Sequence, residues 1–189
     1  MKVRIIASLV LALMFAVGSA SASSIGVYFA GDGSDCDATA APFTPLGWYV
    51  LAHLYGDAGI DGLTGAEFRV SGVPGAWFHT ITANPAANTV LGNLFSGTNV
   101  AFPGCMPGPW VLLYTVSTFP TAPSGPMTWQ VLAHSVPSSP LFNCPLIVFC
   151  DAPVYSKICV PGGEAFVNGG PCTVGVAPAT WSEVKSLFN

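Results

Sequence analysis

The sequence predicts an all-β protein, an antiparallel β-sandwich that is stabilised by disulfides and followed by a short C-terminal helix. Three observations support this fold class. Short runs rich in Val, Ile, Phe, Tyr, Trp and Thr, which pack well on a pleated surface, recur along the chain. The 21 Gly and 17 Pro residues interrupt these runs every few positions and would break helices. Six cysteines provide an even number for cross-linking.

The apolar runs predict ten short strands, and turn residues at roughly ten-residue spacing indicate two packed sheets. The run at 145–149 is apolar on both faces, as expected for a strand that is covered on each side. The expected strands cover residues 25–30, 47–54, 64–71, 77–82, 89–95, 98–102, 110–118, 127–134, 145–150 and 155–160.

The two ends of the chain differ from this pattern. Residues 1–22 have the composition of a cleavable signal peptide, with Lys2 and Arg4 before an apolar run and small residues at 20–22. The apolar run is shorter than the ~20 residues of a membrane-spanning helix, so we expect cleavage after Ala22 and no transmembrane segment in the mature protein. We therefore expect the protein to be secreted, either to the extracellular space or to the periplasm.

The C-terminal segment is the best candidate for a helix. Residues 161–178 are rich in Gly and Pro and are expected to be irregular. In residues 179–189, Thr180 and Glu183 have the spacing of a capping box. The predicted organisation is thus a signal peptide at 1–22, a β-sandwich domain at 23–178 and a helical tail at 179–189.

The charge of the mature chain restricts its partners. Its 167 residues contain three basic and nine acidic side chains, a formal net charge of −6. Nucleic acid is excluded as a partner, because phosphate recognition needs clustered Lys and Arg. A surface with so few charges tolerates close association, which favours a protein partner or self-association.

The cysteines all lie in the exported part, where disulfides form. Six cysteines allow 15 pairings. In an extended strand at 144–150, Cys144 and Cys150 would be about 20 Å apart, which excludes a bond between them. A hairpin that turns near 151–153 would bring Cys150 opposite Cys159. The resulting candidates are Cys36–Cys105, Cys150–Cys159 and Cys144–Cys172.

No motif in the sequence indicates an enzyme. A serine hydrolase would need a nucleophile on a turn such as GxSxG, which does not occur, and His53, His79 and His134 are isolated within expected strands. Glu67 lies two residues before Arg69 on the polar face of its strand, so we expect an exposed ion pair rather than a catalytic acid. We name no catalytic residue, and a secreted hydrolase is retained as a second alternative.

Two further groups of residues are candidate ligand sites. Asp32, Asp35 and Asp37 on a Gly-rich loop offer the oxygen ligands that calcium prefers, although their spacing is not that of an EF-hand and a solvated turn is favoured. We expect no cofactor, and calcium is the one candidate. Four tryptophans in expected strands could present rings to a sugar, so a carbohydrate-binding module with a glycan partner is the first alternative. These residues are Trp48, Trp77, Trp110 and Trp129.

The stretch Thr64-Gly65-Ala66-Glu67-Phe68-Arg69-Val70, following the strand at 48–54, resembles the "xGxEFxV" strand of bacterial secreted cohesin-like domains, which are immunoglobulin-like β-sandwiches. The resemblance covers residues 25–135, and the Trp181–Leu187 segment is similar to the tails of exported proteins of environmental bacteria. Cohesins bind dockerin modules through a sheet face, and related sandwiches bind sugars. The resemblance therefore implies a non-catalytic structural, adhesive or protein-binding module of the bacterial envelope or extracellular matrix. No binding residue is carried over.

Overall fold

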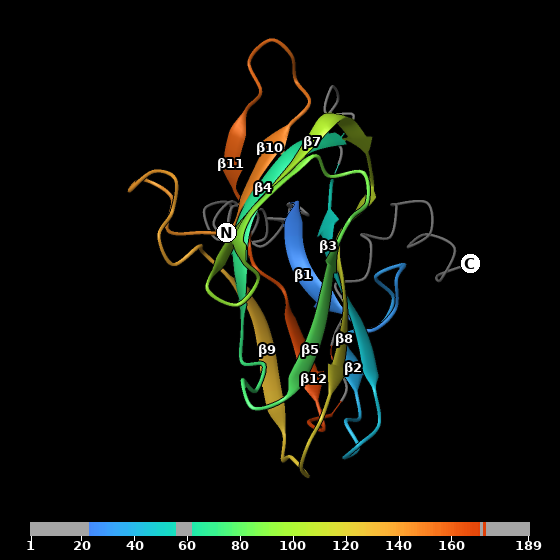
Figure 1. The fold of residues 1–189 in the computed structure, drawn as a ribbon. Coiled ribbons are helices and arrows are strands. Elements are labelled where there is room, and N and C mark those ends of the chain that lie inside the picture. Colours follow the sequence, from blue (N-terminus) through green and yellow to red (C-terminus); the bar gives the residue numbers. More distant parts are fainter. Residues whose placement is uncertain (1–22, 56–61, 171, 173–189) are drawn as a thin grey trace, which may run out of the picture.

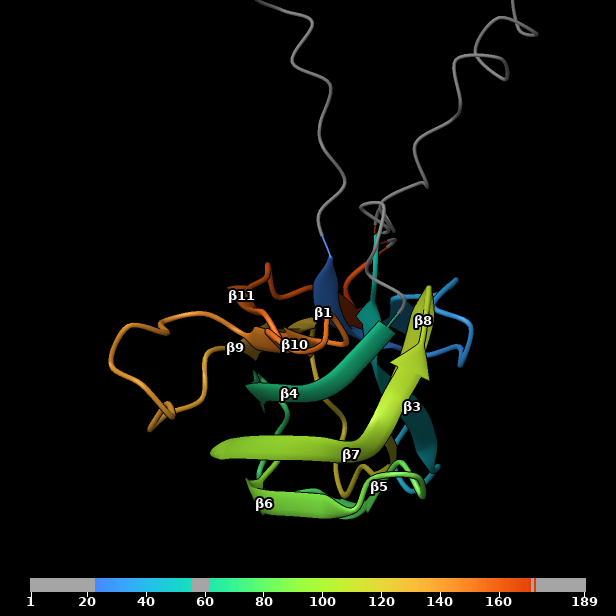
Figure 2. The same cartoon turned by 90° about the horizontal axis from the view of Figure 1, so that it is seen from above.

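The computed structural model describes residues 23–55, 62–170 and 172, which form a sandwich of two β-sheets (Figures 1 and 2). These residues contain twelve strands and no helix, so the predicted disulfide-stabilised all-β sandwich is confirmed. The predicted signal peptide and the predicted helix at 179–189 lie outside the described residues. Within the described part, no helix has the length and apolarity needed to span a membrane.

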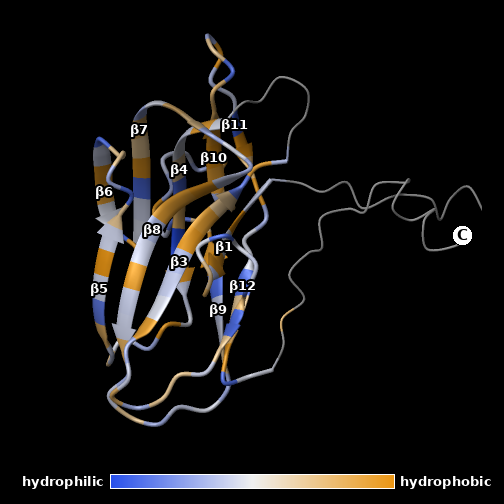
Figure 3. Ribbon diagram, turned by 90° about the vertical axis from the view of Figure 1, so that its right-hand side faces the viewer, coloured by the Kyte–Doolittle hydropathy of each residue, from blue (hydrophilic) through white to orange (hydrophobic). Residues whose placement is uncertain are grey.

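One layer is a four-stranded antiparallel sheet, hereafter the front sheet, with strand order β1-β3-β8-β5. Its central strands β3 and β8 pair along eight residue positions. Burial alternates along β5 and over most of β8, as in a sheet with one face in the core, and hydrophobic bands recur along both strands (Figure 3). The strands are β1 (Ser24–Tyr28), β3 (Leu46–His53), β8 (Trp110–Phe119) and β5 (Phe78–Ala83).

The other layer, hereafter the back sheet, follows the order β11-β10-β4-β9-β12-β2, and β4 also pairs with β7, which pairs with β6. All pairings are antiparallel except that of β12 with β2. The strands are β2 (Asp37–Ala38), β4 (Gly62–Ser71), β6 (Thr89–Asn93), β7 (Gly97–Pro107), β9 (Met127–Leu132), β10 (Leu146–Phe149), β11 (Lys157–Cys159) and β12 (Glu164–Val167).

The ten predicted strands all correspond to observed strands, and two further strands were missed. β12 lies inside the 161–178 segment that was expected to be irregular, so that expectation is wrong at 164–167. β2 has only two residues. β2 is too short to carry a periodic signal, and β12 lies between Gly- and Pro-containing stretches that indicated a loop. Both strands are held by pairing with distant segments, β12 with β9 and β2 with β12. β7 also continues to Pro107, five residues beyond its predicted end.

Aromatic side chains from both sheets fill the core between the layers. The rings of Trp48 from β3 and Trp129 from β9 lie 5.2 Å apart, and Trp77 lies 6.4 Å from Trp129. These three tryptophans are at most 6% exposed. The Trp48 ring nitrogen donates to Thr118 Oγ1 at 2.7 Å, whereas the buried ring nitrogen of Trp129 has no partner among the described residues.

The cysteines pair differently from the prediction, and all three predicted pairings are wrong. The observed bonds are Cys36–Cys172, Cys105–Cys150 and Cys144–Cys159, with Cα–Cα separations of 5.8, 5.6 and 5.4 Å. The turn after β10 is at the predicted place, but its register sets Cys159 opposite Leu146 rather than opposite Cys150. Cys159 therefore lies beside Cys144.

The two remaining bonds follow from the strands that neighbour each cysteine. The amide of Cys150 donates to Gly62 O at the start of β4, and Gly62 pairs with Pro107 on the other side, so Cys150 comes close to Cys105. Parallel pairing of β12 with β2 sets Cys36 beside Phe166, whose amide N–H donates to Cys36 O, and Cys172, six residues further along the chain, bonds to Cys36.

Candidate functional site

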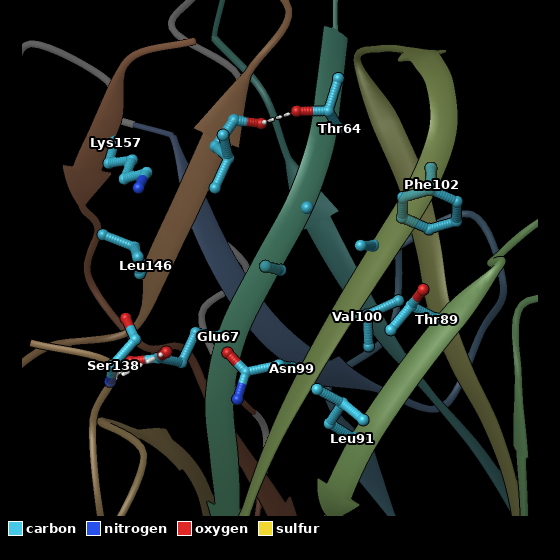
Figure 4. A pocket seen from close by; sticks show the side chains of 14 residues that line it. Thr64, Glu67, Thr89, Leu91, Asn99, Val100, Phe102, Ser138, Leu146 and Lys157 are labelled. Atoms are coloured by element: carbon cyan, nitrogen blue, oxygen red, sulfur yellow. Dashed lines mark hydrogen bonds between the residues drawn. The ribbon is translucent and has the colours of Figure 1, made fainter.

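A hollow of about 440 Å³ lies on the outer face of the back sheet, above strands β6, β7, β4, β10 and β11 (Figure 4). Two rows of outward-facing residues, defined by the strand registers, cross these strands. The first row is Leu91, Asn99, Glu67, Leu146 and Cys159. The second row is Thr89, Ala101, Gly65, Val148 and Lys157.

The hollow exists because two neighbouring residues in the second row are small. Gly65 has no side chain, and Ala101 beside it on β7 contributes one methyl group. Larger side chains stand on either side, Thr89 on β6 and Val148 on β10. A sheet face with small residues at its centre and larger ones at its margins is concave, so the differences in side-chain volume contribute to this depression.

Glu67 helps to fix the lower wall of the hollow. Its side chain is only 3% exposed, and both carboxylate oxygens accept the amide N–H of Ser138, at 3.1 and 3.2 Å (Figure 4). Arg69 instead donates from Nε to Ala133 O at 3.0 Å. The predicted exposed ion pair is therefore wrong, because the loop at 133–145 folds over Glu67 and supplies its partner. The buried carboxylate anchors this loop against the back sheet.

The surroundings of the hollow are apolar and carry little charge. Nine large hydrophobic side chains are exposed in the described part of the chain, and seven of them lie on β6, on the loop at 133–145 or on the β10–β11 hairpin. Lys157 is the cation among the residues that line the hollow. The seven are Val90, Leu91, Val136, Leu141, Val154, Tyr155 and Ile158. Val90 and Ile158 pair with the core residues Val100 and Ile147 and therefore face the inner side of the back sheet. We call the other five the apolar rim.

Two disulfides hold the wall of the hollow that β10 and β11 form. Cys144–Cys159 links the start of β10 to the end of β11, and Cys105–Cys150 links the other end of β10 to β7. At the tip of the hairpin, Asp151 accepts hydrogen bonds from the backbone N–H and the hydroxyl of Ser156, and these bonds hold the pKa of Asp151 below its usual value. The wall is thus covalently fixed at both ends.

The predicted calcium loop is organised as a set of turns. Asp32 accepts hydrogen bonds from the hydroxyl and the amide N–H of Ser34, which lower the pKa of the Asp32 carboxyl. Asp35 accepts the amide N–H of Asp37 at 3.1 Å. Across the described residues, no three His, Cys, Asp or Glu side chains gather closely enough to hold a metal ion. The solvated-turn interpretation accounts for these contacts.

The histidines are not brought into a catalytic arrangement. His79 contacts Thr118 Oγ1 and Pro74 O, each at 3.1 Å, and His134 Nδ1 accepts the amide N–H of Val136. His53 stacks on Trp110 with ring centroids 3.9 Å apart. All three histidines are described, and none hydrogen-bonds a carboxylate. Burial lowers the pKa of both His53 and His79.

The predicted ligand-face tryptophans do not form a platform for a sugar. Trp48, Trp77 and Trp129 are wrong as ligand residues because they are buried in the core. Trp110 is partly exposed, but its ring stacks on His53, and a Cβ built on Gly33 would lie 2.7–2.8 Å from three atoms of the same ring. Neighbouring groups thus already cover this indole.

The sequence could not locate the hollow, although one signal pointed to it. The run at 145–149 was recognised as apolar on both faces, and its outward-facing residues Leu146 and Val148 do line the hollow. The small residues at the centre, Gly65 and Ala101, become neighbours only when β4 pairs with β7. The apolar rim is assembled from segments that are far apart in the chain, so no local pattern reveals it.

Comparison with known proteins supports the fold assignment. No protein-family model and no curated protein matches the sequence. Among solved structures, a cohesin module of a family 33 glycoside hydrolase from Clostridium perfringens superposes with a TM-score of 0.54 at 12% identity, covering 79% of this chain and 99% of that one. The fold is therefore cohesin-like, and the predicted resemblance is confirmed at the level of the fold.

Two further cohesins were found at lower structural similarity. The sixth cohesin of scaffoldin B from Acetivibrio cellulolyticus, solved in complex with the Cel5 dockerin, gives a TM-score of 0.49 at 10% identity and covers 79% of this chain and 100% of that one. A non-cellulosomal cohesin from the archaeon Archaeoglobus fulgidus gives 0.48 at 10% identity and covers 78% and 91%.

Proposed function

We propose that this protein is a non-catalytic, secreted protein-binding module that uses the outer face of β6, β7, β4, β10 and β11. The observation that carries the proposal is the hollow over Gly65 and Ala101 together with its apolar rim. An exposed cluster of large apolar side chains around a depression is typical of a protein interaction site.

The chemistry of the surface indicates what a partner would present. The hollow is large enough for one or two apolar side chains, and its floor is formed by backbone and a single methyl group at Gly65 and Ala101. Desolvation of such a floor requires no charged group to lose water, so an aliphatic or aromatic side chain from the partner would bind as an anchor. Lys157 and Asn99 at the margin could then orient the partner by hydrogen bonds.

The rigidity of the site also favours binding. Side chains that are already ordered before association lose less conformational entropy when the partner binds. The bonds Cys105–Cys150 and Cys144–Cys159 order the β10–β11 wall of the hollow in this way, and the contact between Glu67 and Ser138 orders the lower wall. The resemblance to cohesins led us to expect a sheet face as the binding surface, and the hollow lies on such a face.

Secretion is part of the proposal. Residues 1–22 have the pattern of a signal peptide, and three disulfides fit an oxidising compartment. We place the module in the envelope or extracellular matrix of a bacterium, in a structural or adhesive role. Carbohydrate binding, the alternative predicted from the tryptophans, has lost its supporting observation because those rings are buried or covered.

The proposal is tested by filling the hollow. Ala101→Phe places a ring where a partner's anchor would bind, and Thr115→Phe places the same ring on an exposed position of the front sheet as a matched control. Immobilised mature protein is incubated with the cell-surface and secreted proteins of the producing bacterium, and captured proteins are identified by mass spectrometry.

The affinity of a captured protein is then measured by calorimetry. We expect Ala101→Phe to weaken binding by at least about thirtyfold and Thr115→Phe to leave it unchanged. Equal binding by wild type and Ala101→Phe would overturn the proposal, as would selective loss with Thr115→Phe.

A further inference from the structure

The unpaired edges of the two sheets are protected to very different degrees. β2 has only two residues and begins with Asp37, and β11 has three residues, begins with Lys157 and ends in a disulfide. β1 is covered, because Ile25 exchanges backbone hydrogen bonds with Pro161 and Gly163. Short length, charge and covering segments are the features that prevent edge strands from pairing with other chains.

The remaining two edges lack these features. Every residue of β6 is exposed, and within the described part of the chain the strand is paired on one side only. Its sequence Thr-Val-Leu-Gly-Asn contains no charged residue and no Pro. β5, the edge of the front sheet, is also uncharged. Figures 2 and 3 place β5 and β6 along the same side of the sandwich. One side of the molecule is thus open to strand pairing in both layers.

We propose that a second copy of this chain pairs with the β6 edge, antiparallel and about a two-fold axis at Leu91, so that the back sheet continues from one copy into the other. This inference is independent of the proposed binding function. It assigns to β6 a partner strand of identical sequence.

The sequence of β6 is compatible with pairing to itself. With the axis at Leu91, the two Leu91 side chains, which are 61% exposed, face each other. Val90 of each copy then lies opposite Gly92 of the other, where the absence of a side chain leaves room. Thr89 lies opposite Asn93, so their polar groups are neighbours. No like charges meet along the edge, although the chain as a whole is acidic.

Burial of the exposed apolar groups would stabilise the pair. Leu91 and Val90 leave solvent, and β5 presents a further exposed ring, Phe78 at 71%, on the same side. Five paired residues form a small interface, so we expect a weak, concentration-dependent dimer rather than a permanent one. Because Leu91 also lines the hollow, the two hollows would lie next to each other along one continuous sheet.

Sedimentation equilibrium of the mature, oxidised protein tests the dimer. Wild type is expected to shift from monomer to dimer over a hundredfold concentration range. Leu91→Lys places two ammonium groups opposite each other and should weaken the dimer at least about tenfold. Leu141→Lys is the matched control, since Leu141 is 83% exposed and lies on the loop at 133–145, which is not part of the β6 strand. It should leave the dimer unchanged.

Three results would overturn the inference: a wild-type protein that stays monomeric throughout, a Leu91→Lys variant that dimerises like wild type, or equal losses in both Lys variants. Thermal melting of each variant separates a loss of pairing from a loss of folding. Ala101→Phe leaves the β6 edge intact and is expected to dimerise normally, so a failure of partner binding and a failure of dimerisation give different results.

Discussion

The two outer faces of the sandwich differ in whether a large side chain covers their small residues. On the front sheet, Gly26 is covered by the ring of Tyr28, three atoms of which lie 2.8–2.9 Å from the position that a Cβ would take. Leu51, which pairs with Gly26, is only 1% exposed. On the back sheet, Gly65 and Ala101 have no such cover, and a hollow remains.

The difference teaches that a glycine in a strand does not by itself create a site. Tyr28 reaches Gly26 from two residues further along the same strand, and burial raises the pKa of its hydroxyl, with a smaller contribution from Tyr55 nearby. The outward residue two positions after Gly65 is Glu67, which turns to Ser138 instead of lying over the glycine. Whether a small residue is covered depends on the direction of the neighbouring large side chain, and the contacts of that side chain set its direction.

The largest expected effect on stability comes from removing the side chain that covers Gly26 on the front sheet. Tyr28→Ala removes the cover of Gly26 and its edge contact with the Trp110 ring, at 5.3 Å between centroids. Because Tyr28 is partly exposed, we expect a loss of about 2–3 kcal/mol in the free energy of unfolding, measured by urea denaturation. Leu141→Ala, at an exposed loop position, should change it by less than about 0.5 kcal/mol. Similar values for both variants would contradict the comparison.

The next largest effect on stability is expected from replacing the core tryptophans, one from each sheet. Trp48→Phe removes the donor to Thr118 Oγ1, whereas Trp129→Phe removes a ring nitrogen that has no partner among the described residues. Both rings are fully buried, so the two variants lose similar volume. We expect Trp48→Phe to be less stable than Trp129→Phe by about 1–2 kcal/mol in chemical denaturation. The reverse order would mean that the Trp129 ring nitrogen has a partner in solution.

A smaller effect on stability is expected when one small residue on each face is replaced by a larger one. Gly26→Ala forces the Tyr28 ring to move and should cost about 1 kcal/mol. Ala101→Val adds two methyl groups inside an open hollow and should change the stability by no more than about 0.5 kcal/mol. Thermal melting of the two variants side by side is sufficient. The contrast fails if Ala101→Val is the more destabilising change.

The smallest effect is a pH dependence that belongs to the front sheet. Trp48 donates to Thr118 Oγ1, whose hydroxyl donates to His79 Nδ1 when that ring is neutral and protonated at Nε2 toward Pro74 O. Burial lowers the pKa of His79 and His53 below 6.5, so the unfolded chain binds protons more tightly. Stability should therefore be complete above pH 6.5 and should decrease as the pH falls below it.

The measurement is the free energy of unfolding between pH 7 and about pH 5, above the range where carboxylates titrate. The effect is modest because both rings are partly exposed. The double variant His53→Gln/His79→Gln should have a flatter profile over this interval than wild type. His134→Gln is the control, and an equal flattening there would contradict the assignment to the front sheet.

Most of the strands could be predicted from the sequence, but the location of the candidate site could not. Runs of β-branched, aromatic and other apolar residues identified ten of the twelve strands, because such side chains pack well on a pleated, buried surface. The disulfide partners depended on register: a correctly placed turn after β10 still left Cys159 four residues away from a position opposite Cys150. The environment of Glu67 depended on a hydrogen bond to a residue 71 positions away. Side-chain patterns report which face is buried, and not what covers the other face.

The bond between Cys36 and Cys172 has a mechanical consequence. It joins positions separated by 136 residues, and β2 to β12 all lie between them. A pulling force applied before residue 36 and after residue 172 would pass directly through this covalent link. The strands enclosed by the link would carry no tension, and only β1 could be peeled away. A module that connects two surfaces under shear could thus stretch at its margins while its interior stays folded.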